Sequence, residues 1–247
     1  MFKETALDRN DVAQTIERLR GGLILSCQAE GDNPFNKPEH IALFARAGQM
    51  GGTCGIRACG LDNIRAIRQA TTLPIIGITK SRYPDGSVLI TGDFTDVEGL
   101  QAAGADIIAM DATARKRPNG LSGAEFMCRC KVRCQLPLMA DVSNVGEGMA
   151  AAQAGADIVA GTLSGYTSPK GSSGNDEPDW QLLAALVKAV KIPVIMEGRV
   201  WTPQQACRAL RMGAFAVVVG TAITRPIDIV RRFVDQMETV NEIKQGS

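Results

Sequence analysis

"QAAGADIIAMDAT" (residues 101–113) and "AQAGADIVAGTLS" (residues 152–164) repeat one unit, in which a helix end, Gly-Ala-Asp and a short apolar run follow one another. RMGAFAVVVGTA (residues 211–222) repeats the unit loosely. The glycine suits a helix C-terminus, where the backbone turns left-handed. The apolar run does not alternate with polar residues, which is typical of a strand covered on both faces. The unit therefore predicts helices that alternate with buried parallel strands.

Eight short apolar runs along the chain have the character of such strands. They are residues 23–26, 55–57, 74–78, 106–111, 137–141, 157–161, 193–197 and 216–220. Three of them, in LPIIG, LPLMA and IPVIM, begin at a proline, where a missing N–H does little harm. Eight strands alternating with helices predict an α/β fold, a (β/α)8 TIM barrel that forms a single domain over residues 1–247. A doubly wound open sheet is the alternative, but no G-x-G-x-x-G follows the first strand.

Amphipathic stretches separate these runs and predict the helices. One precedes the first strand, where Val12, Ile16 and Leu19 share a face. The others cover residues 61–70, 97–103, 147–154, 180–190, 203–212 and 226–237. Four residues are placed as N-caps: Thr95, Ser143, Asp179 and Thr202.

Composition excludes several classes of function. The net charge is +1, with acids and bases interspersed, which gives no support to nucleic-acid or anionic-membrane binding. No apolar run has the length of a transmembrane helix, and the start MFKETALDRNDV lacks the apolar core of a signal peptide. We expect a cytoplasmic protein that binds neither membranes nor nucleic acid.

Metal chemistry also finds little support in the sequence. The seven cysteines are expected to be reduced thiols. CRCKVRC (Cys128, Cys130 and Cys134) lacks the paired spacing of a zinc site, so we interpret these residues as packing residues of a helix. His40 is the only histidine, which excludes a pair of histidine ligands. We expect no metal or organic cofactor, and acid–base chemistry carried by Lys, Glu or Asp.

In a barrel the active site forms at the C-terminal ends of the strands. The residues found there are Ser26, Cys27, Gln28, Arg57, Lys80, Asp111, Asp141, Thr162, Ser164, Glu197, Gly198, Arg199, Gly220 and Thr221. The charged residues among them could instead have no function beyond neutralising one another in structural ion pairs. For Lys80 and Glu197 we favour function, because each ends an apolar strand that gains nothing from a charge. Gln28 and Arg57 are substrate contacts or loop clamps, and for Asp111 structural and functional roles stay equally open.

The last two strands indicate an anion site. Gly198 and Gly220 let backbone N–H groups approach a ligand closely, and Arg225 adds a positive charge nearby. These glycines could instead serve only tight turns. The polar loop at residues 165–177 is either a mobile cover over the site or a passive surface loop.

Eight motifs in order along the chain resemble the N-acetylmannosamine-6-phosphate 2-epimerase (NanE) family of sialic acid catabolism. They are SCQ (26–28), GIRA (55–58), PIIGITK (74–80), DAT (111–113), MADVS (139–143), GTLSGYT (161–167), EGR (197–199) and VGTAITRP (219–226). The resemblance runs from about residue 20 to residue 230 and implies a (β/α)8 barrel that interconverts N-acetylmannosamine 6-phosphate and N-acetylglucosamine 6-phosphate. Some members carry Lys at the position of Arg199, and others carry K-R-D where this chain has Lys80-Ser81-Arg82.

The resemblance also implies roles for single residues. Lys80 and Glu197 would be the catalytic pair. The matching Gln28, Arg57 and Asp141 would bind the sugar and its N-acetyl group, and Gly198, Gly220, Thr221 and Arg225 would lie around the phosphate. We also expect Thr162 and Arg199, which follow strand ends, to bind the substrate. Barrels of this kind often form dimers, so we expect a homodimer.

Epimerisation at C2 requires a proton to leave one face of the carbon and another to arrive on the opposite face. We expect Lys80, as a neutral amine, and Glu197, with a pKa raised by burial or by Asp141, to be the two groups, and Arg57 to stabilise the enolate. Two rival functions stay open. One is a phosphosugar aldolase in which Lys80 forms a Schiff base, and the other is a phosphosugar-binding protein without turnover.

Overall fold

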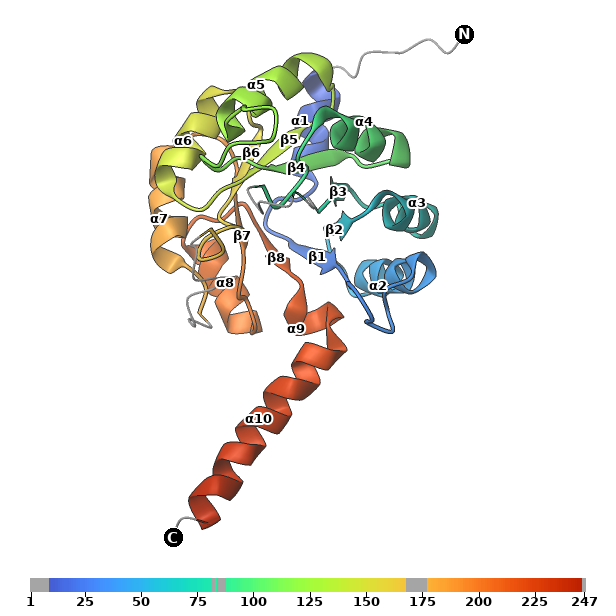
Figure 1. The fold of residues 1–247 in the computed structure, drawn as a ribbon, viewed down its shortest axis with the longest axis vertical. Coiled ribbons are helices and arrows are strands. Elements are labelled where there is room, and N and C mark those ends of the chain that lie inside the picture. Colours follow the sequence, from blue (N-terminus) through green and yellow to red (C-terminus); the bar gives the residue numbers. More distant parts are fainter. Residues whose placement is uncertain (1–8, 81–82, 84–87, 168–176, 246–247) are drawn as a thin grey trace.

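Eight parallel strands close into a barrel in a computed structural model, which describes residues 9–80, 83, 88–167 and 177–245 (Figure 1). The strands are β1 (Leu23–Cys27), β2 (Gly55–Cys59), β3 (Ile75–Ile78), β4 (Ile107–Asp111), β5 (Leu138–Asp141), β6 (Ile158–Ala160), β7 (Val194–Glu197) and β8 (Ala216–Val219). Each strand pairs with the next in the sequence, and β8 pairs with β1 to close the ring. The predicted (β/α)8 barrel is confirmed, and each predicted strand is present within two residues at either end.

Helices alternate with the strands and form the outer layer of the barrel (Figure 1). They are α1 (Arg9–Glu17), α2 (Pro38–Met50), α3 (Leu61–Ala70), α4 (Phe94–Ala103), α5 (Gly123–Arg133), α6 (Val145–Gln153), α7 (Trp180–Ala189), α8 (Pro203–Arg211), α9 (Thr221–Thr224) and α10 (Pro226–Gln245). The predicted helices are all present, and α10 runs eight residues beyond its predicted end. The helices α2, α5 and α9 lie outside the predicted amphipathic stretches. For α9 the reason is its length, because four residues show no amphipathic period.

The glycine and the aspartate of the repeated Gly-Ala-Asp unit each have a structural role. Gly104 and Gly155 have φ angles of 97° and 100°, the left-handed backbone expected after a helix. The carboxylates of Asp106 and Asp157 each accept a hydrogen bond of 2.8 Å from the first N–H of the preceding strand, at Ile75 and Leu138 respectively. The aspartate therefore joins neighbouring strands at the N-terminal end of the barrel.

Two of the four predicted N-caps are correct and two are wrong. The side chains of Asp179 and Thr202 each accept a hydrogen bond from the backbone N–H of the third residue of their helices. Thr95 lies inside α4, because Asp93 supplies the cap and forms a reciprocal pair with Asp96. Ser143 gives way to Asn144, whose side chain accepts from the Glu147 N–H. Adjacent residues with capping side chains made both positions ambiguous in the sequence.

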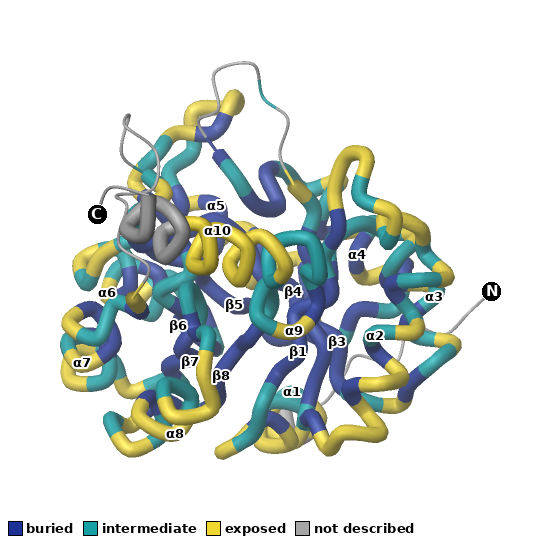
Figure 2. The backbone as a smooth tube through the Cα atoms, turned by 90° about the horizontal axis from the view of Figure 1, so that it is seen from below, coloured by how far each residue is buried: buried dark blue, intermediate teal, exposed yellow. Residues whose placement is uncertain are grey.

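The strands are coloured as buried along most of their length (Figure 2), and the buried apolar side chains form two clusters around them. Inside the barrel, mostly aliphatic side chains such as Ile24, Ile76, Met139, Ile158 and Ile195 fill the lumen. A larger cluster lies between the strands and the helices. The barrel is therefore a packed core that closes the lumen below the C-terminal strand ends.

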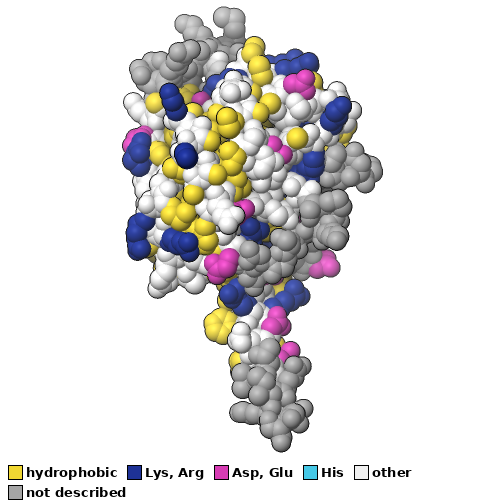
Figure 3. All heavy atoms as spheres, turned by 90° about the vertical axis from the view of Figure 1, so that its left-hand side faces the viewer, with side chains coloured by type: hydrophobic (Ala, Val, Ile, Leu, Met, Phe, Trp, Pro, Cys, Tyr) yellow, Lys and Arg dark blue, Asp and Glu magenta, His cyan; other side chains and the backbone are white. Residues whose placement is uncertain are grey.

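The helix α10 projects from the barrel as a stem, which Figure 1 and Figure 3 show from two sides. Four of its apolar side chains, Val230, Phe233, Val234 and Met237, are 44–68% exposed. Arg232 stacks over the ring of Trp201 at 4.4 Å, which ties the start of the stem to the loop after β7. Among the described helices, none has the length and apolar character needed to cross a membrane.

Candidate active site

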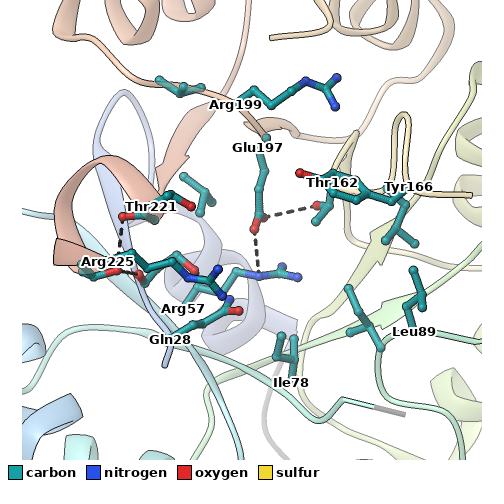
Figure 4. Close-up of a pocket in the computed structure, with 18 of the residues that line it drawn as sticks. Gln28, Arg57, Ile78, Leu89, Thr162, Tyr166, Glu197, Arg199, Thr221 and Arg225 are labelled. Carbon is teal, nitrogen blue, oxygen red and sulfur yellow. Dashed lines mark hydrogen bonds and ion pairs between the residues drawn. The ribbon is translucent and has the colours of Figure 1, made fainter. Parts of the chain in front are cut away.

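A cavity of about 560 Å³ opens at the C-terminal ends of the strands (Figure 4). Ten of the eleven predicted site residues line it. They are Gln28, Arg57, Lys80, Thr162, Glu197, Gly198, Arg199, Gly220, Thr221 and Arg225. The structure thus brings together residues that are up to 197 positions apart in the chain, as the barrel topology predicts.

The eleventh residue, Asp141, lies beneath the cavity wall and is fully buried. Its two carboxylate oxygens accept hydrogen bonds of 3.3 and 2.6 Å from the two terminal nitrogens of Arg57. Thr162 donates a further bond of 2.7 Å to the same carboxylate. Burial raises the pKa of Asp141, whereas the charge and hydrogen bonds of Arg57 and the hydrogen bond from Thr162 act to lower it. Asp141 therefore fixes Arg57 and Thr162 from behind.

Arg57 joins the buried Asp141 to Glu197 at the floor of the cavity. Its side chain is 1% exposed, and its Nε atom lies 3.2 Å from an oxygen of Glu197 (Figure 4). Burial alone would lower the pKa of Arg57, but the carboxylates of Asp141 and Glu197 outweigh burial and raise it above its usual range. Arg57 is a permanent cation held between two acids.

Glu197 ends β7 with a side chain that is only 12% exposed. Burial raises its pKa, the charge of Asp141 also raises it, and Arg57 and the hydroxyl of Thr162 lower it, with a net pKa of about 7. The Thr162 hydroxyl lies 3.3 Å from Glu197 (Figure 4). A carboxyl group that titrates near neutral pH can both accept and donate a proton, as an acid–base catalyst must. The predicted rise in the pKa of Glu197 is confirmed.

Lys80 lies two residues beyond the end of β3, at the mouth of the cavity. An antiparallel bridge to Ile90 fixes its backbone. Next to this bridge, Thr91 donates a hydrogen bond of 2.7 Å to the carbonyl of Ala109. The ammonium of Lys80 donates to a carboxylate oxygen of Glu30. Lys80 is thus anchored by its backbone, and its side chain is paired at the rim of the site.

Asp111, whose role the sequence left open, does not reach the cavity. The residue is fully buried. Its carboxylate accepts hydrogen bonds from the N–H of Leu89 at 3.0 Å and from Arg115 at 2.7 Å, and its own N–H donates to the carbonyl of Ile90. Asp111 therefore holds the segment that pairs with Lys80, which is a structural role next to the site.

Gly198, Gly220, Thr221 and Arg225 form one side of the cavity. Gly198 has a φ of 110°, and a Cβ atom there would meet nothing within 4 Å, so the backbone is open to a ligand. At Gly220 a Cβ atom would lie 3.2 Å from the side chain of Ser26, so a larger residue there would crowd β1. These backbones therefore leave room for an anion beside Arg225.

Arg199 points away from Glu197 and toward the loop after β6 (Figure 4). Its guanidinium donates to the carbonyls of Ser164 and Glu177, at 2.9 and 2.8 Å, which lie at the two ends of the loop. The predicted cover at residues 165–177 falls mainly on residues 168–176, which lie outside the described part of the chain. Arg199 thus joins the two described ends of that loop.

Two residues with positive φ other than glycine occur in the described chain, and both adjoin this cavity. They are Thr91, with φ of 45° behind Lys80, and Arg199, with φ of 56°. Such backbone conformations cost free energy in residues with a side chain and concentrate at functional sites. Their positions agree with a functional role for this end of the barrel.

Sequence reasoning missed Glu30, Tyr166 and Trp201. Tyr166 and Trp201 line the cavity, and Glu30 pairs with Lys80 at its rim. Glu30 follows SCQ by only two residues, which was the one available signal. The cysteines of CRCKVRC do not share a site, because Cys128 is exposed while Cys130 and Cys134 are buried. Their interpretation as packing residues of a helix is confirmed for Cys130, which is buried within α5, and is wrong for Cys128, which is exposed, and for Cys134, which lies just past the end of α5.

Comparison with known proteins identifies the same family that the motifs resemble. A family model described as "Putative N-acetylmannosamine-6-phosphate epimerase" matches residues 41–239. A protein of Caldanaerobacter subterraneus subsp. tengcongensis, named "Putative N-acetylmannosamine-6-phosphate 2-epimerase", is 45% identical over 222 residues, which cover 89% of this chain and 92% of that protein. A protein of Cutibacterium acnes with the same name is 42% identical over 224 residues, which cover 90% of this chain and 96% of the other.

Solved structures agree with the sequence comparison. The N-acetylmannosamine-6-phosphate 2-epimerase from Clostridium perfringens superimposes with a TM-score of 0.83 at 42% identity, over 89% of this chain and 95% of that one. A thiamine phosphate pyrophosphorylase from Pyrococcus furiosus has a TM-score of 0.56 at 17% identity, over 90% of this chain and 98% of that one. The second likeness concerns the barrel fold alone.

Proposed function

The chain belongs to the N-acetylmannosamine-6-phosphate epimerase family, and we propose that it interconverts N-acetylmannosamine 6-phosphate and N-acetylglucosamine 6-phosphate with Lys80 and Glu197 as the acid–base groups. One observation carries this assignment. A buried carboxyl group with a pKa of about 7 and a lysine line the same cavity at the C-terminal strand ends. The reaction places the protein in sialic acid and amino sugar catabolism.

The chemistry requires two groups because C2 is inverted. The C2 proton becomes removable in the open-chain sugar, where the C1 carbonyl takes up the charge as an enolate. Glu197 in its ionised form accepts the proton from one face, and the ammonium of Lys80 delivers a proton to the other. In the opposite direction Lys80, as a neutral amine, accepts and protonated Glu197 donates.

Arg57 supports the enolate electrostatically. It is a fixed cation, preorganised by its two hydrogen bonds to Asp141, so it needs no reorganisation when negative charge develops near Glu197. Gln28 and Thr162 offer an amide and a hydroxyl to the sugar from the same floor. Asp141 contributes to substrate binding through Arg57 and Thr162, since it lies behind both.

Charge on the cavity wall supports a phosphorylated substrate. Four basic side chains line the cavity, Arg57, Lys80, Arg199 and Arg225, against one carboxylate, Glu197, among the described lining residues. The phosphate would bind at the open backbone of Gly198, Gly220 and Thr221, next to Arg225. Its contribution is to orient the sugar so that C2 lies between the acid–base groups.

Incubation of the purified protein with N-acetylmannosamine 6-phosphate in D2O, followed by NMR, tests this function. We expect the C2 configuration to invert, with deuterium incorporated at C2 in both directions. Product that retains the original hydrogen would contradict the two-group mechanism, and no inversion would contradict the function.

The two rival functions predict different results with the same sample. An aldolase would form a covalent adduct at Lys80 that borohydride traps, with cleavage products in the NMR spectrum. A phosphosugar-binding protein would bind the substrate and leave it unchanged. The paired acid and base favour turnover, because binding alone does not need a carboxyl group that titrates near pH 7.

We also propose that residues 1–247 form one domain in the cytoplasm and that this domain assembles as a homodimer. The seven unpaired cysteines support a reducing compartment. Val230, Phe233, Val234 and Met237 support the homodimer, because a second copy would cover their exposed apolar surface. Light scattering of wild type and of Phe233→Glu tests this. We expect a dimer that the substitution weakens, and a monomeric wild type would contradict it.

A further inference from the structure

Glu30 lies at the rim of the cavity and pairs with both Lys80 and Arg225. The residue lies in the segment between β1 and α2, and its side chain is 49% exposed. One of its carboxylate oxygens accepts hydrogen bonds both from the ammonium of Lys80 and from the guanidinium of Arg225, the latter at 3.2 Å. The proposed acid–base lysine and the proposed phosphate contact therefore share a single anionic partner.

The carboxylate of Glu30 is ionised in this arrangement. Partial burial acts to raise its pKa, but the hydrogen bond from Lys80 and the charges of Lys80 and Arg225 outweigh burial and hold the pKa below its ordinary value. Without this negative charge, two cations would face each other across the mouth of the site. The negative charge of Glu30 thus allows Lys80 and Arg225 to lie close together.

A phosphate group that binds Arg225 competes directly with Glu30. A guanidinium has a limited set of donors, and a phosphate dianion offers it more charge than a carboxylate does. The same dianion repels the carboxylate of Glu30, because both are negative and close together. Within the described chain, Arg225 forms one other ion pair, with Asp228 at 3.9 Å, and Asp228 does not contact Lys80.

We propose that Glu30 is a positioning residue that couples phosphate recognition at Arg225 to the placement of Lys80. Before substrate binds, Glu30 holds the ammonium of Lys80 at the rim of the cavity. The phosphate of the substrate displaces Glu30 from Arg225 and pushes it away, which frees Lys80 to turn toward the sugar. The inference rests on the proposed function in one respect, since it takes Lys80 as an acid–base group.

The variant Glu30→Gln tests the competition without turnover. Glutamine keeps the size of the side chain and removes its charge, and the site is exposed, so the variant is expected to fold. Calorimetric titration with inorganic phosphate should show binding at least about threefold tighter than in wild type, the range expected for an exposed ion pair. Equal or weaker phosphate binding by Glu30→Gln would overturn the inference, whatever the enzyme's activity.

A second measurement tests the coupling to Lys80. We compare kcat/KM for N-acetylmannosamine 6-phosphate with that for unphosphorylated N-acetylmannosamine. In Glu30→Gln no carboxylate holds Lys80 at the rim, so Lys80 can turn toward the sugar without phosphate. The preference for the phosphorylated sugar should therefore fall at least about fivefold relative to wild type. An unchanged preference, including no detectable turnover of the unphosphorylated sugar by either protein, would overturn the coupling.

Asp228→Asn is the matched control. It also removes a negative charge beside Arg225, but it does not touch Lys80. It should tighten phosphate binding and should not lower the preference for the phosphorylated sugar, because only that sugar gains from tighter phosphate binding. If Asp228→Asn lowers that preference as much as Glu30→Gln does, the effect comes from general charge and the inference fails. If wild type does not invert C2, the proposed function fails, and the phosphate titration still reports on Glu30.

Discussion

The Nε atom of Arg57 lies 3.2 Å from a carboxylate oxygen of Glu197 at the floor of the cavity. The cation lowers the pKa of this carboxyl group, but burial and the charge of Asp141 prevail and hold it at about 7. The balance keeps Glu197 able to exist in both protonation states at neutral pH. It also predicts the direction in which the activity changes with pH.

The pH profile of kcat/KM should show a limb near pH 7. In the direction in which Glu197 accepts the C2 proton, the ionised form is needed, so activity rises as pH increases through about 7. In the reverse direction the enzyme needs protonated Glu197 with neutral Lys80, a form that carries the same number of protons, so kcat/KM should rise over the same range. The equilibrium constant between the two sugar phosphates does not depend on pH and therefore fixes the ratio of the two kcat/KM values. Measuring both directions checks that the two limbs coincide. Glu197→Gln should lose about 10²–10⁴-fold in kcat and show no such limb, and a limb that persists in this variant would assign it to another group.

Asp141→Asn should lower the pKa of Glu197. The charge of Asp141 raises that pKa, and Arg57 would have Glu197 as its remaining close anion. The limb should move below pH 7. The variant should also unfold more easily, by about 3–5 kcal/mol, because one half of a buried ion pair is lost. Chemical denaturation and the pH profile measure the two effects.

Asp62→Asn is the control for the stability effect. Asp62 also pairs with an arginine, Arg65, but its side chain is 81% exposed. Exposed pairs contribute at most about 1 kcal/mol. If the two variants lose equal stability, the buried position of Asp141 has no special importance.

The sequence predicted the barrel because its signals are local. A proline at a strand start or a glycine at a helix end acts on its immediate neighbours, and Gly104 and Gly155 have the expected backbone. The predicted strand ends then place Lys80 and Glu197 on one cavity, because the topology requires it.

What the sequence could not predict depends on contacts between distant segments. Asp141 and Glu197 both end strands, and only packing decides that one is buried behind Arg57 and the other faces the cavity. Glu30 and Arg225 are 195 residues apart and meet only when the barrel closes. Similarly, the role of Asp111 depends on its contacts with Leu89 and Ile90, which no sequence pattern predicts.

Thr162→Val should raise the pKa of Glu197 above about 7. The hydroxyl of Thr162 stabilises the ionised carboxylate, and valine has nearly the same shape without the hydroxyl. A hydrogen bond of ordinary strength corresponds to a shift of up to about one pH unit. The limb of the pH profile should therefore move to higher pH. Thr162→Ser retains the hydroxyl and should keep the limb of wild type, and a downward shift in Thr162→Val would contradict this account of Glu197.

Asp111→Asn should impair catalysis without a direct contact with the substrate. The carboxylate accepts from the N–H of Leu89, and Ile90 forms the bridge to Lys80. An amide in place of the carboxylate removes the charge that holds Arg115 and weakens the acceptor for Leu89. Lys80 would then be less well placed, and small errors of placement are costly for proton transfer. We expect kcat to fall roughly tenfold to a hundredfold with a smaller change in KM.

Asp157→Asn separates this effect from a general loss of stability. Its carboxylate likewise accepts from a strand N–H, that of Leu138, and pairs with a cation, Lys131, but at the opposite end of the barrel. Both variants should lose about 1–3 kcal/mol of unfolding free energy, and only Asp111→Asn should lose kcat. Equal losses of kcat in the two variants would show that stability alone is responsible. That result would remove Asp111 from the group of residues that position Lys80.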